Sequence, residues 1–383
     1  MTSPRIIVIA PDSFKGSLTS IEAAQAMAQG VQRVWPDAVC RLLPMADGGE
    51  GTLDACLHGD ASGERLRTQV RGAGSTPCDA QFGIKQRDGK AVAIIEVAQV
   101  VGITDPAGMA APVGQRTTIG VGELLRQVLD RGVRDVMLGL GGSSTNDGGA
   151  GLLVGLGARL LDASGKTVEP IPDQLQRVSK IDLSGLDARL GQSRLVILSD
   201  VNNPLTGPLG ATAVFGPQKG VTAGLRAVYD SAIGRFAESA ERAFQRTAQN
   251  LPGAGAAGGL GFACRLLGGT VHSGAEVIAG LLQLDQALQG AGWALTGEGR
   301  SDMQTLHGKT PCIVARHARQ LGLPVTLLSG SVDRAALPAL SEVFNGCFSS
   351  SFGPASLREL MDDSRALLAD AAGQIACLIG RTM

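Results

Sequence analysis

The chain has 383 residues, of which 44% are hydrophobic and 18% charged, and its formal net charge is -1 at pH 7. This length suits two domains better than one core, and two domains usually enclose one cleft. Aromatic residues make up only 3% of the chain, and no basic excess is present to neutralise a phosphate backbone. The composition therefore argues against a nucleic-acid partner.

The cysteines and histidines indicate neither a disulfide framework nor a zinc site. The seven cysteines form no CxxC motif, their number is odd, and the four histidines form no HExxH motif. The sequence also has no apolar stretch of about 18 residues and no signal-peptide h-region. We therefore expect reduced thiols, a cytoplasmic location and no membrane partner.

The first 65 residues predict two successive βα units. Residues 5–10 read as a buried strand, and Thr19 with Glu22 forms a capping box for the helix that follows. Residues 39–45 read as the second strand, and Thr52 begins the next helix. Two such units predict a parallel sheet whose carboxyl edge carries both connecting loops.

From about residue 67 the pattern changes to that of a mixed sheet. The dipeptide Asp88-Gly89 predicts a hairpin turn between strands 80–85 and 91–97. Further along, the predicted elements are a helix at 120–131, a strand at 136–138, a turn at 162–165, a strand at 194–199 and a helix at 225–248.

The βαβ pattern returns near residue 285. We predict strands at 293–296, 325–328 and 347–350, a helix at 310–321, and a last helix capped by Ser356 with Glu359. The predicted fold is therefore α/β, with a discontinuous parallel-sheet domain (residues 1–65 and 285–383) and an inserted mixed α/β domain (66–284). We expect the active site in the cleft between these domains.

The segment 139–151, GLGGSSTNDGGAG, follows an apolar strand and resembles a phosphate-binding loop. Glycines allow an anion to approach backbone N-H groups, hydroxyls add donors, and Asp147 offers a carboxylate for magnesium. The alternative is a tight turn without a ligand. Similar loops recur at four other places, which favours the functional interpretation. The predicted cofactor-binding residues here are Gly141, Gly142, Ser143, Ser144, Thr145 and Asn146.

Two loops near the N-terminus carry charged candidates. Lys15 lies at the tip of the first strand, where it would bind a phosphate or carboxylate, or would be a solvated surface lysine. Asp47 lies among glycines after the second strand, where it would act as a metal ligand or general base. The alternative is a capped helix start in which Glu50 favours the helix dipole.

Two loops of the central region are candidates of a different kind. Asp200 follows an apolar strand beside two asparagines and would orient an acceptor, or would form an Asx turn. The uncharged segment 253–261 offers only backbone, for a phosphate cradle or for close packing. Its candidate cofactor-binding residues are Gly255, Gly258 and Gly259.

The segment 296–310 combines acidic and basic side chains at another strand tip. Its charged residues are Glu298, Arg300, Asp302 and Lys309. Gly308-Lys309-Thr310 does not complete a Walker A motif, since Met303 stands where that motif needs glycine, and no clean GxGxxG motif follows a strand. Carboxylates for a metal together with cationic clamps are what phosphoryl transfer to a small acid requires.

These motifs together resemble those of the type 1 glycerate kinases. The strings, in chain order, are APDSFKGSLT, PMADGGEGT, GGSSTNDGGAG, SDVNNPLTGPLGA, FGPQKG, GAGAAGGLG and TGEGRSDMQTLHGK. Ser144, Ser301, Leu306 and His307 depart from the pattern. The resemblance implies a flavodoxin-like domain with an inserted mixed α/β domain. It also implies ATP-dependent phosphorylation of D-glycerate, with 2-phosphoglycerate as the favoured product, in glycerate, glyoxylate or sugar-acid breakdown.

The chemistry of that reaction suggests roles for the candidates. We predict that Asp47 and Asp200 lie near Mg²⁺ and the acceptor hydroxyl, that Asp302 is a third metal ligand, and that Lys15, Arg300 and Lys309 are charge clamps. Three alternatives stay open: phosphorylation at the 3-hydroxyl, a dinucleotide-dependent hydroxy-acid oxidoreductase, and a non-catalytic sensor of small acids. The sequence leaves the oligomeric state open.

Overall fold

A computed structural model describes residues 5–87 and 89–380, which form two compact units. The first unit contains the chain up to Asp47, Asp54–His58, and the chain from Ser273 onward. The second contains Gly48–Leu53 and Gly59–His272. The sequence placed the domain boundaries after residues 65 and 284, and that division stays a prediction.

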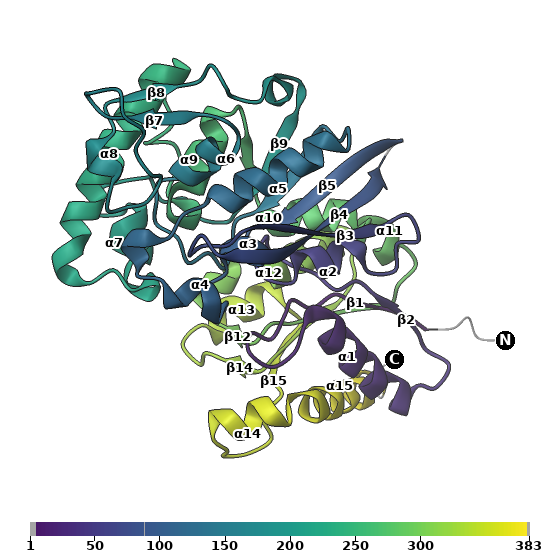
Figure 1. Ribbon diagram of the computed structural model, residues 1–383. Coiled ribbons are helices and arrows are strands. Elements are labelled where there is room, and N and C mark those ends of the chain that lie inside the picture. Colours follow the sequence, from purple (N-terminus) through teal and green to yellow (C-terminus); the bar gives the residue numbers. More distant parts are fainter. Residues whose placement is uncertain (1–4, 88, 381–383) are drawn as a thin grey trace. The chain divides into compact units, whose positions relative to one another are not determined.

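The first unit is built on a five-stranded parallel sheet to which both ends of the chain contribute (Figure 1). Its strands are β1 (Ile6–Ile9), β2 (Val39–Leu42), β11 (Trp293–Thr296), β13 (Val325–Ser329) and β15 (Gly346–Ser349), in the order β2-β1-β11-β13-β15. Counted along the chain, this is the 2-1-3-4-5 order of flavodoxin-like folds. The structure therefore confirms the predicted fold class. The strand predicted at 39–45 is shorter than expected and ends at Leu42.

The helices of this unit follow the predicted pattern with one difference. The capping box of Thr19 and Glu22 is present at α1 (Ser20–Val34), and that of Ser356 and Glu359 begins α14 (Leu357–Asp362). The chain leaves the helical conformation at Asp363, so the predicted last helix is followed by another, α15 (Ser364–Gly380). The remaining elements are α2 (Thr52–Leu57), α10 (Gly274–Leu281), α11 (Leu284–Leu288), β12 (Arg300–Ser301), α12 (Thr310–Gln320), β14 (Ser331–Val332) and α13 (Leu337–Val343).

Helices α1 and α15 lie side by side at one face of the sheet (Figure 1). Their backbones approach closely at Gly30, where an added Cβ would lie 1.9 Å from the carbonyl oxygen of Ala369. The side chains of Met27 and Trp293 are fully buried in the core of this unit. The N- and C-terminal segments of the chain therefore share one hydrophobic core.

The second unit contains a six-stranded mixed sheet. Its strands are β3 (Glu64–Arg71), β4 (Pro77–Arg87), β5 (Lys90–Glu96), β6 (Asp135–Gly139), β9 (Arg194–Leu198) and β10 (Thr270–His272), in the order β10-β9-β6-β5-β4-β3. Strands β4 and β5 pair antiparallel, as the hairpin prediction required. Asp88 of the predicted turn lies outside the described residues, and Gly89 has a φ of 74°.

Short helices and a long amphipathic one accompany this sheet. The predicted helices correspond to α5 (Ile119–Asp130) and α8 (Ala223–Phe244). The other elements are α3 (Ala98–Val101), α4 (Pro106–Ala110), α6 (Ala150–Gly155), β7 (Arg159–Leu161), β8 (Lys180–Asp182), α7 (Ala211–Phe215) and α9 (Leu260–Leu266). Within the described part of the chain, none of the helices combines the length and apolar character needed to cross a membrane.

Candidate functional site

The first unit contains a cavity of about 680 Å³ at the carboxyl ends of β1 and β11. In the 2-1-3-4-5 order these two strands flank the point at which the sheet changes direction, where open α/β sheets bind ligands. The charged residues that line the cavity are Asp12, Lys15, Asp47, Glu298, Arg300, Asp302 and Lys309. The order of the strands in the sheet thus brings the segments that follow β1, β2 and β11 to one place.

Asp12 follows β1 and is almost completely buried. Its backbone N-H donates to the carbonyl of Gly297 (2.8 Å), which holds the loop after β1 against the loop after β11. Its carboxylate accepts hydrogen bonds from the Ser13 backbone N-H (2.6 Å) and from the Thr310 hydroxyl (2.8 Å). Burial and then the negative charge of Asp47 raise the pKa of Asp12 from 3.8 to about 7, against the opposing effect of these bonds.

Asp47 is half-buried and belongs to the same group of carboxylates. The backbone N-H of Met45 donates to the carbonyl of Pro11 (2.9 Å), so the segment beyond β2 continues alongside the segment beyond β1. This pairing brings Asp47 close enough to Asp12 for their charges to interact. Glu298 acts on the same Asp12 carboxyl, also raising its pKa.

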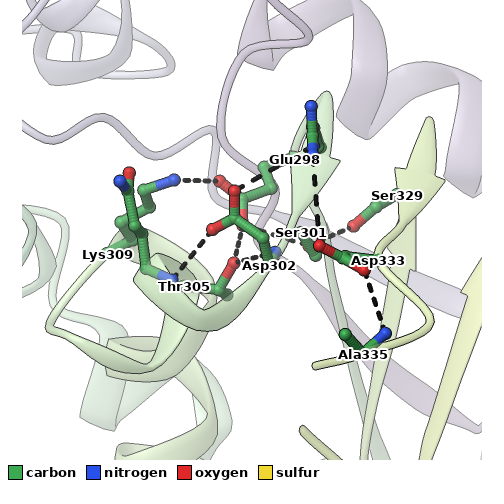
Figure 2. A network of polar contacts seen from close by, with 10 residues as sticks. Glu298, Ser301, Asp302, Thr305, Lys309, Ser329, Asp333 and Ala335 are labelled. Carbon is green, nitrogen blue, oxygen red and sulfur yellow. Dashed lines mark hydrogen bonds and ion pairs between the residues drawn. The ribbon is translucent and has the colours of Figure 1, made fainter. Parts of the chain in front are cut away.

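Glu298 lines the cavity and belongs to a network of polar contacts (Figure 2). One carboxylate oxygen, Oε1, accepts from the hydroxyls of Ser301 (3.0 Å) and Thr305 (2.6 Å). The other, Oε2, lies 3.7 Å from the Lys309 ammonium. Burial raises the pKa of Glu298, while the Thr305 hydroxyl and the Lys309 charge oppose that shift.

Asp302 belongs to the same network (Figure 2), and it forms a long ion pair with the more exposed Arg300. Asp302 caps a single 3₁₀ turn, Met303–Leu306, by accepting from the Gln304 backbone N-H at 2.8 Å. The Arg300 guanidinium lies 4.0 Å from both Asp302 and Asp333, and its side chain is 69% exposed. These long ion pairs leave the donors of Arg300 available to an anionic ligand.

The structure therefore brings together five of the predicted site residues: Lys15, Asp47, Arg300, Asp302 and Lys309. Asp12 and Glu298 were not among the predicted catalytic or metal-binding residues, although both lie in the loops that the sequence singled out. The signal that could have found them is position, because each lies just beyond a buried strand of the parallel sheet. Asp200 is exposed, follows β9 and belongs to the second unit, and its role stays a prediction.

The glycine-rich segment 139–151 connects β6 to α6 in the second unit. Ser143 is 6% exposed, and the next four residues have no exposed surface. The Ser144 hydroxyl donates to the carbonyl of Val101 (3.0 Å), and the Asn146 amide donates to the Thr212 hydroxyl (3.0 Å). Most of the predicted side-chain donors of this loop thus have partners within their own unit.

Asp147 organises the start of α6 from inside this unit. Its carboxylate accepts from the Thr118 backbone N-H and hydroxyl, both at 2.8 Å, and from the backbone N-H groups of Gly149 (3.0 Å) and Gly151 (3.1 Å). Burial raises the pKa of Asp147 in spite of these four bonds. This arrangement resembles a buried helix cap.

A buried lysine lies beneath the same loop. The Lys219 ammonium donates to the Ser143 hydroxyl (3.1 Å) and to the Thr145 carbonyl (2.7 Å), and only 2% of Lys219 is exposed. Burial lowers the pKa of Lys219 to about 7, and the nearby Asp147 carboxylate opposes that shift. The Arg116 guanidinium donates to the carbonyls of Ser144 (3.1 Å) and Lys219 (2.9 Å). Two cationic side chains thus fix the backbone of the glycine-rich loop.

The glycines predicted to bind a cofactor pack closely against other backbone. A Cβ at Gly258 would lie 2.1 Å from the Thr145 carbonyl oxygen, and one at Gly255 would lie 2.3 Å from that of Pro204. A Cβ at Gly259 or Gly141 would lie 2.4 Å from the Cα of another glycine. Close packing explains why glycine occupies these positions. A role of Gly141, Gly142 and the three downstream glycines in binding a cofactor stays a prediction.

Comparison with known proteins identifies the family. Residues 7–380 match the glycerate kinase family. The chain belongs to this family. It is 42% identical over 380 residues to the glycerate kinase of Bacillus subtilis (strain 168), with 97% of both chains covered. It is 40% identical over 328 residues to the glycerate 2-kinase of Escherichia coli (strain K12), with 85% of each chain covered.

A solved structure supports the same assignment. The chain superimposes on a crystal structure of a Salmonella typhimurium LT2 protein assigned as glycerate kinase 2, with a TM-score of 0.84, 38% identity and 100% coverage of both chains. The protein is therefore an enzyme, a phosphotransferase of this family.

Proposed function

We propose that the protein transfers the terminal phosphoryl group of ATP to the 2-hydroxyl of D-glycerate, forming 2-phosphoglycerate, in the breakdown of glycerate, glyoxylate or sugar acids. The observation that supports this most directly is the cavity of the first unit, where three interacting carboxylates face three cationic side chains. The names of the relatives, glycerate kinase and glycerate 2-kinase, support the substrate and the position of the hydroxyl.

The cationic side chains would bind the anionic groups of the reaction. Lys15, Arg300 and Lys309 come from different loops and line one cavity, so they can contact a phosphate chain from several sides. The transition state of phosphoryl transfer is loose, and it is stabilised mainly by positioning and by opposite charge. Of these three cations, Arg300 is the one suited to bidentate contact with a phosphate or carboxylate.

The carboxylates would serve the metal and the acceptor hydroxyl. In the described residues, no group of three or more His, Cys, Asp or Glu side chains is arranged to hold a metal ion by itself. Mg²⁺ in kinases, however, is usually held by one or two carboxylates together with phosphate oxygens. The mutual repulsion of Asp12 and Asp47 fits such a cation, because a positive charge between them would relieve it.

We therefore assign Asp47 and Asp12 as the residues that would hold Mg²⁺, which would neutralise charge on the transferred phosphoryl group when bound. Glu298 keeps Lys309 in place through their ion pair. The carboxyl groups of Asp12 and Asp47 also lie where one of them can orient the acceptor hydroxyl through a hydrogen bond. The original candidates Asp200 and Asp302 stay predictions as metal ligands.

A coupled assay tests the proposed function. The purified protein should consume ATP only when D-glycerate and Mg²⁺ are both present, and enolase alone should convert the fresh product. If enolase acts only after phosphoglycerate mutase is added, the product is 3-phosphoglycerate and the assignment of the hydroxyl is wrong. Oxidation of glycerate with a change in nicotinamide absorbance, and without ATP consumption, would overturn the kinase proposal itself.

A further inference from the structure

The cavity of the first unit has two chemically different sides. One side carries the charged residues described above. The other side is apolar and consists of Phe14, from the loop after β1, and of Leu357, Leu360 and Met361 from α14. We call these four residues the apolar wall. The proposed transfer of a phosphoryl group to a small acid uses the charged side and leaves the apolar wall without a role.

The position of the apolar wall is fixed by its surroundings. The capping box between Ser356 and Glu359 defines the start of α14. Met361 lies against the loop after β1, since a Cβ added at Gly16 would lie 2.8 Å from the Met361 Cε atom. Leu357, in contrast, is 73% exposed although it borders the cavity. A large apolar side chain exposed beside a charged pocket is a place where a ligand would cover it.

The size and the two-sided lining of the cavity indicate the class of ligand. A volume of about 680 Å³ lies within the usual range of small-molecule sites. D-glycerate is a three-carbon acid with almost no apolar surface, so it would occupy a small part of this space and leave the wall in water. A nucleoside triphosphate has a flat, largely apolar base at one end and an anionic phosphate chain at the other.

We infer that this cavity is the nucleotide site, with the base of ATP against Leu357, Leu360 and Met361 and the phosphate chain toward Lys15, Arg300 and Lys309. This inference rests on the proposed function, in which ATP is the phosphoryl donor. It differs from the sequence prediction that residues 141–146 form the cofactor cradle. In that loop, buried hydrogen bonds within the second unit already engage Ser143, Ser144 and the Asn146 amide.

Binding measurements on the full-length protein can separate the base from the phosphates. Calorimetric titrations with ADP and with inorganic tripolyphosphate would compare the wild type with the variants Leu357→Ser and Met361→Ser. We expect each variant to weaken ADP binding by about fivefold to tenfold, and to change tripolyphosphate binding less than about twofold, because only the base loses apolar contact. Lys15→Ala should weaken the binding of both ligands.

A matched control is provided by Leu378→Ser, because Leu378 is an exposed leucine of α15 that does not line the cavity. It should bind both ligands as the wild type does. Leu357→Ser keeps the test informative if Met361→Ser fails to fold, since the largely exposed Leu357 contributes little to the core. ADP binding that is unchanged in Leu357→Ser would overturn the inference.

Photolabelling gives an independent readout. With 8-azido-ATP, we expect labelled peptides from the loop after β1 or from α14, protected by excess ADP. Protected labelling confined to the second unit would overturn the inference while leaving the proposed kinase reaction intact. Conversely, ADP binding that depends on the apolar wall in a protein that does not phosphorylate D-glycerate would contradict the proposed function and leave the nucleotide site standing.

Discussion

The Thr310 hydroxyl donates a hydrogen bond of 2.8 Å to the carboxylate of Asp12, across 298 positions of the sequence. Asp12 follows β1, and Thr310 is the first residue of α12. Both residues are buried. The contact ties the loop after the first strand to a helix contributed by the C-terminal part of the chain.

We expect Thr310→Val to lower the free energy of unfolding of the first unit by about 1–3 kcal/mol, because it removes the hydroxyl that satisfies one oxygen of a buried carboxylate. Urea unfolding followed by tryptophan fluorescence reports on this unit directly, since Trp35 and Trp293 both belong to it. Thr310→Ser keeps the hydroxyl and should recover most of the loss. Equal destabilisation by both substitutions would contradict this explanation, because Thr310→Ser keeps the hydroxyl and loses only the methyl group.

Asp47→Asn should keep the fold and reduce kcat by two to four orders of magnitude, equivalent to roughly 3–5 kcal/mol of transition-state stabilisation. The reason is that Asp47 lines the cavity with Asp12 and would hold the metal or orient the hydroxyl. Steady-state kinetics and thermal unfolding would be measured together, with the exposed Asp37→Asn as control. Near-normal turnover with a lowered Tm would show that Asp47 serves the helix start instead.

Lys15→Ala should raise KM for ATP or D-glycerate more than it lowers kcat, because an exposed lysine on a flexible stem contributes mainly to binding of the ground state. Kinetics at varied concentrations of each substrate would show which KM changes. A fall in kcat at unchanged KM would instead place Lys15 on the transferred phosphoryl group.

Most of the first unit was predictable from local sequence patterns. A buried strand such as residues 293–296 is a mainly apolar run, and the capping box at Thr19 indicates where a helix begins. Both signals are local and do not depend on distant contacts. The end of the second strand was harder, because residues 43–45 are apolar and the Leu43 and Met45 N-H groups still pair with the chain at Ile9 and Pro11, although the strand ends at Leu42. Tertiary contacts, which a local pattern does not contain, decide such boundaries.

The candidate site was predictable in its loops but less so in its residues. Lys15, Arg300 and Lys309 could be identified from the sequence, because they are charged residues in glycine-rich loops. The importance of Asp12 was not visible, because its environment comes from Asp47, Glu298 and Thr310, which lie in two other segments of the chain. In the same way, the sequence shows that residues 143–147 are polar but cannot show that they are buried.

Two glycine substitutions in helices of the first unit should have opposite effects, because only one of the glycines lies where two helices approach closely. Gly30→Ala should destabilise the first unit by about 1–3 kcal/mol, because its Cβ would lie 1.9 Å from the Ala369 carbonyl oxygen and the helices would have to separate. Gly280→Ala in α10 meets no atom within 4 Å and should stabilise by up to about 1 kcal/mol. Thermal unfolding compares the two, and an unchanged Tm in Gly30→Ala would contradict the close packing.

The buried Lys219 predicts a dependence of stability on pH. Its pKa is 10.5 in an exposed lysine and about 7 in the fold, with Asp147 and Arg116 as the charged groups that act on it. Between these values the unfolded chain binds the proton and the folded chain does not, so stability rises with pH across that range. Below pH 7 both states are protonated, and the folded state bears the full cost of the buried charge.

Lys219→Met removes this titration. The free energy of unfolding of the wild type, relative to that of the variant, should therefore rise by roughly 1 kcal/mol per pH unit between pH 7 and 9.5. Urea unfolding at both pH values, followed by circular dichroism, measures the change. The variant also loses the hydrogen bonds to Ser143 and Thr145, which lowers its stability at both pH values. Because this loss is the same at both values, it does not change the expected dependence on pH. The control is Lys166→Met, at an exposed lysine of the same unit, for which the difference from the wild type should not change with pH. The same pH-dependent difference for both variants would mean that the pKa of Lys219 is not lowered.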